Sequence, residues 1–126
     1  MLGGRFSFPE RTESEIVVAD PFTGEVKSRV RAPYPNFSAA LATAGGLVFT
    51  GLGDGTFIAY DDTTLEPLWK INVGSGFNAP PIAFAVDGKQ YVAIASGLSL
   101  LSKGRLTLTP ELRDMRTQTM LFVFAL

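Results

Sequence analysis

The sequence predicts an all-β fold, specifically part of a β-propeller, on the strength of two observations. Short stretches of β-branched and aromatic residues recur along the chain, and Gly, Pro or Asp turn signals separate them. Residues 16–25 also resemble residues 57–66, which places Asp61 41 residues after Asp20. A repeat of roughly 40 to 50 residues, with about four strands in each unit, is typical of propeller blades.

Each predicted strand follows from its own residue pattern. The first is β-branched and ends at Asp20-Pro21, and most later segments are apolar or aromatic runs that end at glycine or aspartate. The segment around Trp69 alternates between apolar and polar residues and ends at Gly74. The predicted strands are residues 15–19, 47–50, 56–60, 68–73, 81–86, 90–95 and 120–125.

The remaining segments are expected to form turns, one short helix and a loop. Asp87-Gly88 separates two strands where a tight hairpin needs positive backbone angles. Thr109-Pro110-Glu111 combines an N-cap, a proline at the first helical position and an acid in the first turn, which predicts a short helix through about Met115. Residues 99–107 have no clear period and are expected to form an ordered loop.

This pattern also predicts how the chain is organised. Residues 1–126 are expected to form one partial propeller, with blade-like repeats at about 12–55 and 56–98. Residues 99–126 are expected to supply a C-terminal loop and a closing strand. Two antiparallel sheets are expected, over roughly 16–50 and 57–95.

Composition excludes several kinds of function. Lys and Arg number 11 and Asp and Glu number 12, so the net charge is -1 and no basic face indicates nucleic acid binding. The chain has no His and no Cys, which excludes disulfides, thiol nucleophiles, Cys/His zinc sites and Ser-His-Asp arrangements. Apolar runs stop well before the roughly 20 residues of a membrane helix, and residues 1–5 lack the apolar core of a signal peptide.

Three motifs have structural explanations that are favoured over functional ones. Residues 20–25 (Asp-Pro-Phe-Thr-Gly-Glu) have the side chains of a hairpin turn. Residues 51–55 look like the start of a dinucleotide-binding loop, but a predicted strand follows them where that motif requires a helix. Asp54, Asp61 and Asp62 lack the spacing of an EF-hand calcium loop, so they are interpreted as turn carboxylates.

Trp69 is the only tryptophan of the chain. A large flat side chain on a strand can stack between two sheets, because aromatic residues bury much area with defined geometry. We expect Trp69 to be mostly buried at a packing surface between the sheets, with ligand stacking as the alternative.

Five stretches of the sequence carry a resemblance to a known family. They are residues 41–51, 59–69, 74–81, 87–97 and 120–126. In this order, and over nearly the whole chain, they resemble the quinoprotein methanol and ethanol dehydrogenases, which use pyrroloquinoline quinone (PQQ). The sequence departs from the family's blade motif at Ser28, where the family has Trp, and at Leu65, where it has Gly.

The resemblance implies about two blades, at the C-terminal end, of an eight-bladed quinoprotein alcohol dehydrogenase-like propeller. Such an enzyme is periplasmic and oxidises primary alcohols: PQQ takes the hydride, a calcium or lanthanide ion polarises the quinone, an Asp acts as base and cytochrome c accepts the electrons. The family's catalytic and metal-binding residues lie upstream of the matching segments, so the resemblance assigns none of them here. We therefore expect this chain to be inactive alone, and its exposed strand edges to favour self-association.

The resemblance assigns cofactor contacts to Phe37 and Ser38. Relatives often place an aromatic residue, in some cases Trp, beside the cofactor just before the stretch that matches residues 42–46, and Phe37 aligns there with Ser38 adjacent. The alternative for Phe37 is a core aromatic. The alternatives for the whole chain are a non-catalytic propeller scaffold and a small β-module that oligomerises to complete a ring.

Overall fold

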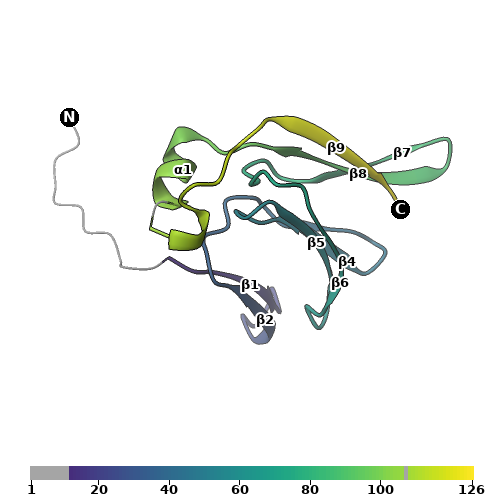
Figure 1. Ribbon diagram of the computed structural model, residues 1–126. Helices are drawn as coiled ribbons and strands as arrows, with labels where there is room; N and C mark the ends of the chain where they lie inside the picture. Colours follow the sequence, from purple (N-terminus) through teal and green to yellow (C-terminus); the bar gives the residue numbers. More distant parts are fainter. Residues whose placement is uncertain (1–11, 107) are drawn as a thin grey trace, which may run out of the picture.

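The computed structural model describes residues 12–106 and 108–126, which form three antiparallel sheets and two short helical segments (Figure 1). The elements in chain order are β1 (Ser14–Ala19), β2 (Val26–Ala32), β3 (Leu41–Ala42), β4 (Leu47–Gly51), β5 (Thr56–Asp61), β6 (Pro67–Asn72), β7 (Ile82–Val86), β8 (Lys89–Ser96), the helix α1 (Leu100–Leu106), the 3-10 helix η1 (Pro110–Leu112) and β9 (Met120–Ala125). Sheet A is the pair β1-β2, sheet B has the order β3-β4-β5-β6, and sheet C has the order β7-β8-β9. Each sheet therefore consists of strands that are consecutive in the chain, as in a propeller blade.

The sequence-based strands are all present, but the sheets divide the chain differently from the expected two. Sheet B covers residues 41–72, so the expected repeat boundary near residue 55 falls inside it, at the turn between β4 and β5. The reason is that a 41-residue repeat gives the period of the blades, whereas backbone pairing decides which strand begins a sheet. The prediction of an all-β partial propeller is confirmed, and the number of sheets is corrected to three.

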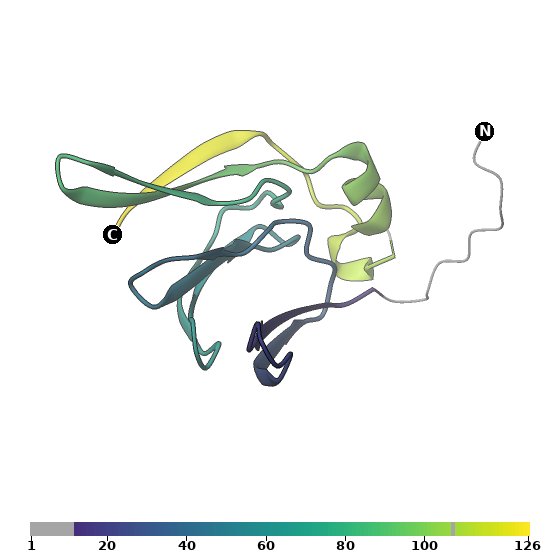
Figure 2. The same cartoon turned by 180° about the vertical axis from the view of Figure 1, so that it is seen from behind.

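Sheet B is the middle layer, between sheet A and sheet C (Figures 1 and 2). Successive side chains of a strand point to opposite faces, so β4 and β5 contribute to two cores. The core toward sheet A contains Val48, Leu52, Ile58, Tyr60 and Leu65, with Ile16, Val18, Val30 and Tyr34 packed against them. The core toward sheet C contains Phe49, Phe57, Ala59, Phe77, Val92 and Ile94, with Leu41, Leu47, Val73, Phe122 and Phe124 packed against them.

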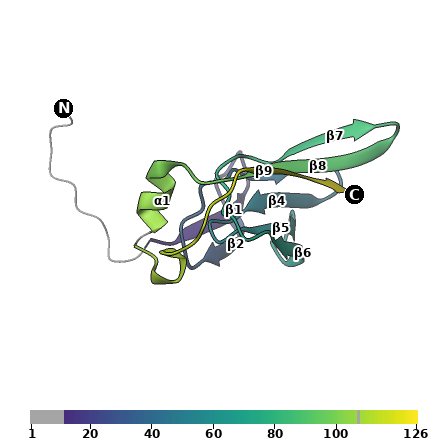
Figure 3. The ribbon, with the colours of Figure 1, turned by 45° about the horizontal axis from the view of Figure 1, so that its top comes forward.

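The connections between strands alternate between the two ends of the sheets (Figure 3). The tight turns at residues 20–25, 43–46, 62–66 and 87–88 lie at one end, which we call the turn end. The longer connections at residues 33–40, 73–81 and 97–119, together with the short turn at residues 52–55, lie at the other end, which we call the loop end and which includes α1. Antiparallel pairing requires this alternation, since each strand reverses the direction of the one before it.

Residues 100–106 form the helix α1, so the expected loop over residues 99–107 is corrected. Ser99 begins the helix: its Oγ accepts the N–H of Ser102 at 3.2 Å, and its carbonyl oxygen accepts the N–H of Lys103 at 2.9 Å. Only Ser102 and Leu106 of this helix are buried. Two buried positions are too few to show a helical period in the sequence. The predicted helix start at Pro110 is confirmed, but this segment is the single 3-10 turn η1.

The predicted hairpin turn and the repeated turn are both present. Asp87 and Gly88 have φ values of 49° and 77°, as a tight hairpin requires. Asp20 Oδ1 accepts the N–H groups two and three residues later at 2.9 and 3.0 Å, and Asp61 Oδ1 does the same at 3.0 and 2.8 Å. These hydrogen bonds, chiefly the one from the third residue, hold the pKa of both carboxyls below its usual value.

In the described residues, no helix has the length and apolar character needed to cross a membrane.

Candidate functional site

The loops that lead into β3 and β7 meet at the loop end. Residues 33–40 connect β2 to β3, and residues 73–81 connect β6 to β7. Ser38 Oγ donates a hydrogen bond to the carbonyl oxygen of Ala79 at 2.8 Å, which joins the two loops. Ser38 and Ala79 are 41 residues apart, so equivalent positions of the two repeats are in contact. Loops held at one end of a rigid scaffold are a frequent location of binding residues.

A chain of hydrogen bonds fixes the first of these loops onto β4. Asn36 Oδ1 accepts the backbone N–H of Ser38 at 2.9 Å, and Asn36 Nδ2 donates to Thr50 Oγ1 at 3.2 Å. Thr50 is fully buried, and its hydroxyl donates to the carbonyl oxygen of Ala39 at 3.2 Å. The backbone on both sides of Phe37 is therefore held in one conformation, as a binding residue requires.

Phe37 and Ser38, the predicted cofactor contacts, thus lie in the loop that enters β3. Phe37 is half-buried and belongs to neither of the two core clusters, which does not favour the alternative of a core aromatic. The Ser38 hydroxyl is engaged with Ala79, so its evident structural role is to connect the loops. Contact of either side chain with a cofactor stays a prediction.

An open hollow with a mixed polar and apolar lining lies beside this junction, and sequence reasoning did not single out its residues. It has a volume of about 330 Å3 and is lined by Asn78, Ala79, Ala95, Ser96, Gly97, Leu98, Ser99 and Thr119. Asn78 stands 41 residues after Phe37, so the repeat could have indicated it as the equivalent loop position. Its Oδ1 accepts a hydrogen bond from Ser102 Oγ at 2.5 Å, which attaches α1 to the second loop.

The segment that returns from α1 to β9 is also attached at the loop end. The hydroxyls of Ser75 and Ser96 both donate to the carbonyl oxygen of Gln118 at 2.8 Å. The N–H of Gln118 in turn donates to Ser75 Oγ at 2.9 Å. Both serines are buried, so these bonds satisfy polar groups that would otherwise be costly.

The two loops that meet at this junction, 33–40 and 73–81, carry no charged side chain to hold an anionic or metallic ligand. Among residues 12–106 and 108–126, no group of three or more carboxylates could hold a metal ion. The loops 33–40 and 73–81 contain no Lys and no Arg. They offer an aromatic ring, amides and hydroxyls, which can contact one side of a planar ligand but cannot neutralise carboxylates.

Tyr34 and Asp54 form a short hydrogen-bonded pair near this end. Tyr34 Oη donates to Asp54 Oδ2 at 2.6 Å, and Asp54 also accepts the N–H of Thr56 at 2.8 Å. Burial, together with the hydrogen bond to Asp54, raises the pKa of Tyr34 well above its ordinary value. Tyr34 therefore remains protonated at neutral pH and acts in this pair as the hydrogen-bond donor.

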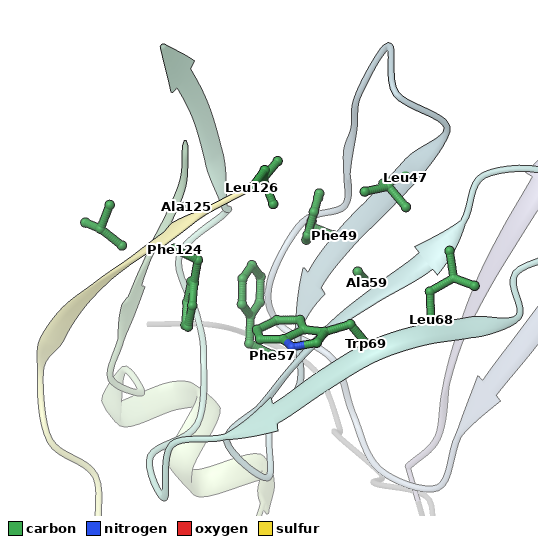
Figure 4. A pocket seen from close by; sticks show the side chains of 10 residues that line it. Leu47, Phe49, Phe57, Ala59, Leu68, Trp69, Phe124, Ala125 and Leu126 are labelled. Carbon is green, nitrogen blue, oxygen red and sulfur yellow. The ribbon is translucent and has the colours of Figure 1, made fainter. Parts of the chain in front are cut away.

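An apolar pocket separates sheet B from sheet C toward the turn end (Figure 4). Its volume is about 480 Å3, and its lining residues are Leu47, Phe49, Phe57, Ala59, Leu68, Trp69, Val123, Phe124, Ala125 and Leu126. The Trp69 ring contacts Phe57 and Phe124 edge to face, with centroid distances of 6.0 and 5.4 Å. Trp69 thus lies between two sheets, as predicted.

The prediction that Trp69 is mostly buried is wrong, because 42% of the residue is exposed. Trp69 lies on β6, the fourth strand of sheet B, whereas sheet C has only three strands in the described residues. No strand of sheet C in the described residues therefore covers the outer side of the Trp69 ring. The smaller number of strands in sheet C also leaves the apolar pocket open on this side.

Comparisons with known proteins agree with the propeller geometry. The family profile described as "PQQ: Glucose/ethanol/alcohol dehydrogenase, beta-propeller domain" matches residues 12–92. Among characterised proteins, lupanine 17-hydroxylase [cytochrome c] from Pseudomonas sp is 45% identical over 87 residues, which is 69% of this chain and 12% of that protein. Quinoprotein ethanol dehydrogenase from Pseudomonas putida is 46% identical over 78 residues, which is 62% of this chain and 12% of that enzyme.

Solved structures give the same result. A europium-containing methanol dehydrogenase superposes with a TM-score of 0.77 at 30% identity, covering 89% of this chain and 23% of that one. A quinohemoprotein alcohol dehydrogenase from Pseudomonas putida HK5 superposes with a TM-score of 0.76 at 29% identity, covering 90% of this chain and 17% of that one. The chain therefore spans about an eighth of the characterised relatives and less than a quarter of these solved chains.

Proposed function

Because this chain belongs to the PQQ-dependent glucose/ethanol/alcohol dehydrogenase β-propeller family, we propose that it is the C-terminal sector of an enzyme that oxidises primary alcohols. The observation that carries the proposal is the junction of the loops 33–40 and 73–81, which presents Phe37 and Asn78 at one end of adjacent sheets. Blades of a propeller surround a central channel, so such a junction is one sector of a site that several blades build together.

In this proposal, PQQ would accept the hydride equivalent of the alcohol, and a calcium or lanthanide ion would polarise its quinone. The europium-containing methanol dehydrogenase among the structural neighbours is consistent with a metal ion in the complete enzyme. The described residues contain no metal-ligand cluster, so other blades would supply the ion's ligands and the catalytic Asp. A cytochrome c as electron acceptor and a periplasmic location are further parts of the proposal, and the name of the lupanine hydroxylase includes cytochrome c.

The residues present fit one side of the cofactor. Phe37 would place its ring against the planar quinone, and Ser38 would hold that loop through its bond to Ala79. PQQ carries carboxylates, and the loops 33–40 and 73–81 contain no cation to pair with them. We therefore propose that this chain alone neither holds PQQ tightly nor turns over alcohol, because the remaining donors lie on other blades.

A chimera tests this function. Residues 12–126 would replace the matching C-terminal region of the Pseudomonas putida quinoprotein ethanol dehydrogenase, and alcohol-dependent dye reduction would be measured with added PQQ and calcium. We expect activity, and we expect Phe37→Ala to weaken PQQ binding in a fluorescence titration. The matched control is Phe22→Ala, an aromatic at the turn end that is 95% exposed, which should leave PQQ binding unchanged.

The outcome separates the dehydrogenase from the competing scaffold function. A folded chimera that binds no PQQ would contradict the proposal and favour a non-catalytic propeller scaffold. Equal loss of PQQ binding in the Phe37 and Phe22 variants would show that Phe37 acts through stability and makes no cofactor contact.

A further inference from the structure

We propose that Ser102 of α1 is a positioning residue for the cofactor. Its hydroxyl holds the second loop (73–81), and through that loop it holds the first loop (33–40), which carries Phe37. This inference rests on the proposed function, since it takes Phe37 as a cofactor contact. The family profile matches residues 12–92, so α1 lies outside the matched residues. What α1 does at the loop end therefore follows from its own contacts.

The helix α1 lies at the loop end and reaches both loops (Figures 1 and 3). Ser102 is 6% exposed, and its Oγ donates to Asn78 Oδ1 in the second loop at 2.5 Å. At the C-terminal end of the helix, Leu106 is 2% exposed and packs beside Gly53. A Cβ atom on Gly53 would lie 3.4 Å from Leu106 Cδ2 and 2.9 Å from the carbonyl oxygen of Pro35 in the first loop. The helix thus holds the second loop directly and approaches the first loop across Gly53.

The first turn of α1 orients the Ser102 hydroxyl. Asn78 Oδ1 can only accept, so the single hydroxyl hydrogen of Ser102 points to it. Ser99 Oγ lies 2.9 Å from Ser102 Oγ and therefore donates to it. Ser99 Oγ also accepts the backbone N–H of Ser102 at 3.2 Å. The donor that faces Asn78 is therefore fixed by two contacts within the same turn.

The second loop depends on this bond at the residues that follow Phe77. Backbone hydrogen bonds attach the earlier part of the loop to the turn between β4 and β5, and the N–H of Phe77 donates one of them at 3.2 Å. The next two residues are held by side-chain hydroxyls, because Ser102 bonds to Asn78 and Ser38 donates to Ala79. Ala79 follows Asn78 directly, so the bond of Ser102 helps to set the position of the carbonyl oxygen that Ser38 uses.

The path from Ser102 ends at the loop backbone beside Phe37. Ser38 Oγ reaches the carbonyl oxygen of Ala79 at 2.8 Å, and Phe37 directly precedes Ser38. Phe37 belongs to neither core cluster, so the backbone of its loop decides where the ring lies. A bond that only fastened α1 would repeat what the buried Leu106 already does. The geometry therefore favours a role of Ser102 in placing the loop.

Binding of PQQ to the chimera that carries residues 12–126 tests this role by fluorescence titration. Ser102→Ala should raise the PQQ dissociation constant about three- to tenfold, as the loss of one hydrogen bond predicts. Ser38→Ala should have a similar effect, and the double variant should bind no more than about twofold more weakly than the weaker single variant, because both changes break one path. The matched control is Ser28→Ala at the turn end, where Ser28 Oγ donates to the carbonyl oxygen of Thr63 at 2.7 Å. This control should leave the dissociation constant unchanged.

Hydrogen exchange of the chimera without PQQ measures the position of the loops independently of the cofactor. Ser102→Ala should raise deuterium uptake in residues 33–40 and 73–81, whereas Ser28→Ala should leave both loops unchanged. Unchanged uptake in β5 would confirm that the sheets stay folded. A wild-type chimera that binds no PQQ would overturn the proposed function and the cofactor role of Phe37. The exchange data would then still decide whether Ser102 positions the first loop.

Three results would overturn the proposal. Increased uptake confined to residues 97–106 would show that the Ser102 bond only fastens α1. Losses of PQQ affinity that multiply in the double variant would show that Ser102 and Ser38 act independently. Equal losses in Ser102→Ala and Ser28→Ala would show an effect of general stability.

Discussion

Leu65 adopts a backbone conformation that leucine rarely tolerates, and replacing it with glycine tests how the second turn is stabilised. Leu65 stands 41 residues after Gly24 in the repeated turn. Gly24 has φ 74° and Leu65 has φ 59°, so both residues occupy the left-handed region. Leu65 is 3% exposed and belongs to the core between sheets A and B, whereas a side chain at position 24 would meet nothing within 4 Å.

Two opposing terms set the effect of Leu65→Gly. Relief of the left-handed conformation contributes about 1–2 kcal/mol, and removal of a buried leucine side chain costs about 2–5 kcal/mol. The expected net change is a free energy of unfolding lower by about 1–3 kcal/mol. Gly24→Ala adds strain without burial and should cost about 1 kcal/mol.

Urea unfolding, followed by the fluorescence of Trp69, measures the stability of both variants at the same low protein concentration. The reasoning predicts a lower midpoint for Leu65→Gly and a smaller decrease for Gly24→Ala. A Leu65→Gly variant that is more stable than the wild type would refute it, because strain would then outweigh burial at this position.

Two further predictions concern side chains next to the cores. Trp69→Ala should lower the free energy of unfolding by about 1–2 kcal/mol. This loss is smaller than the roughly 3–5 kcal/mol of a fully buried aromatic residue, because 42% of Trp69 is exposed. Thermal unfolding followed by circular dichroism measures the loss, and a value above about 3 kcal/mol would contradict the prediction. Burial and the hydrogen bond to Asp54 raise the pKa of Tyr34. The folded state therefore keeps a proton that the unfolded state loses above about pH 10. As a result, the free energy of unfolding falls as the pH rises beyond that value. Tyr34→Phe should make this fall shallower in pH-dependent urea titrations, with a residual slope from Tyr60, whose pKa burial also raises; an unchanged slope would contradict the account.

The sequence predicts seven of the nine strands in the described residues, and the hairpin turns, because their signals are local, but it misses β2 and β3. Alternating or continuous apolar residues mark the strands, and Asp87-Gly88 alone determines the backbone of its turn. The predicted grouping into two sheets was wrong, since the grouping depends on which strands pair across the chain. The helix α1 was missed because its seven residues bury only Ser102 and Leu106, and its start depends on the side chain of Ser99.

The candidate site was predicted only in part. The family resemblance indicated the loop that contains Phe37 and Ser38, and the structure places this loop at the junction of two repeats. Asn78 was missed because a polar residue in an irregular loop carries no periodic signal, although its spacing of 41 residues from Phe37 was available. The exposure of Trp69 could not be predicted, because it depends on a strand that sheet C lacks in the described residues.

The central claim is that these residues supply one sector of a quinoprotein site and do not form that site alone. The most direct measurement adds PQQ, calcium or a lanthanide, ethanol and an artificial electron acceptor to the purified 126-residue chain. The account predicts no alcohol-dependent dye reduction above a buffer control and no tight PQQ binding. Clear ethanol-dependent dye reduction that requires both PQQ and this chain would contradict it, and a base would then have to be found among its own carboxylates.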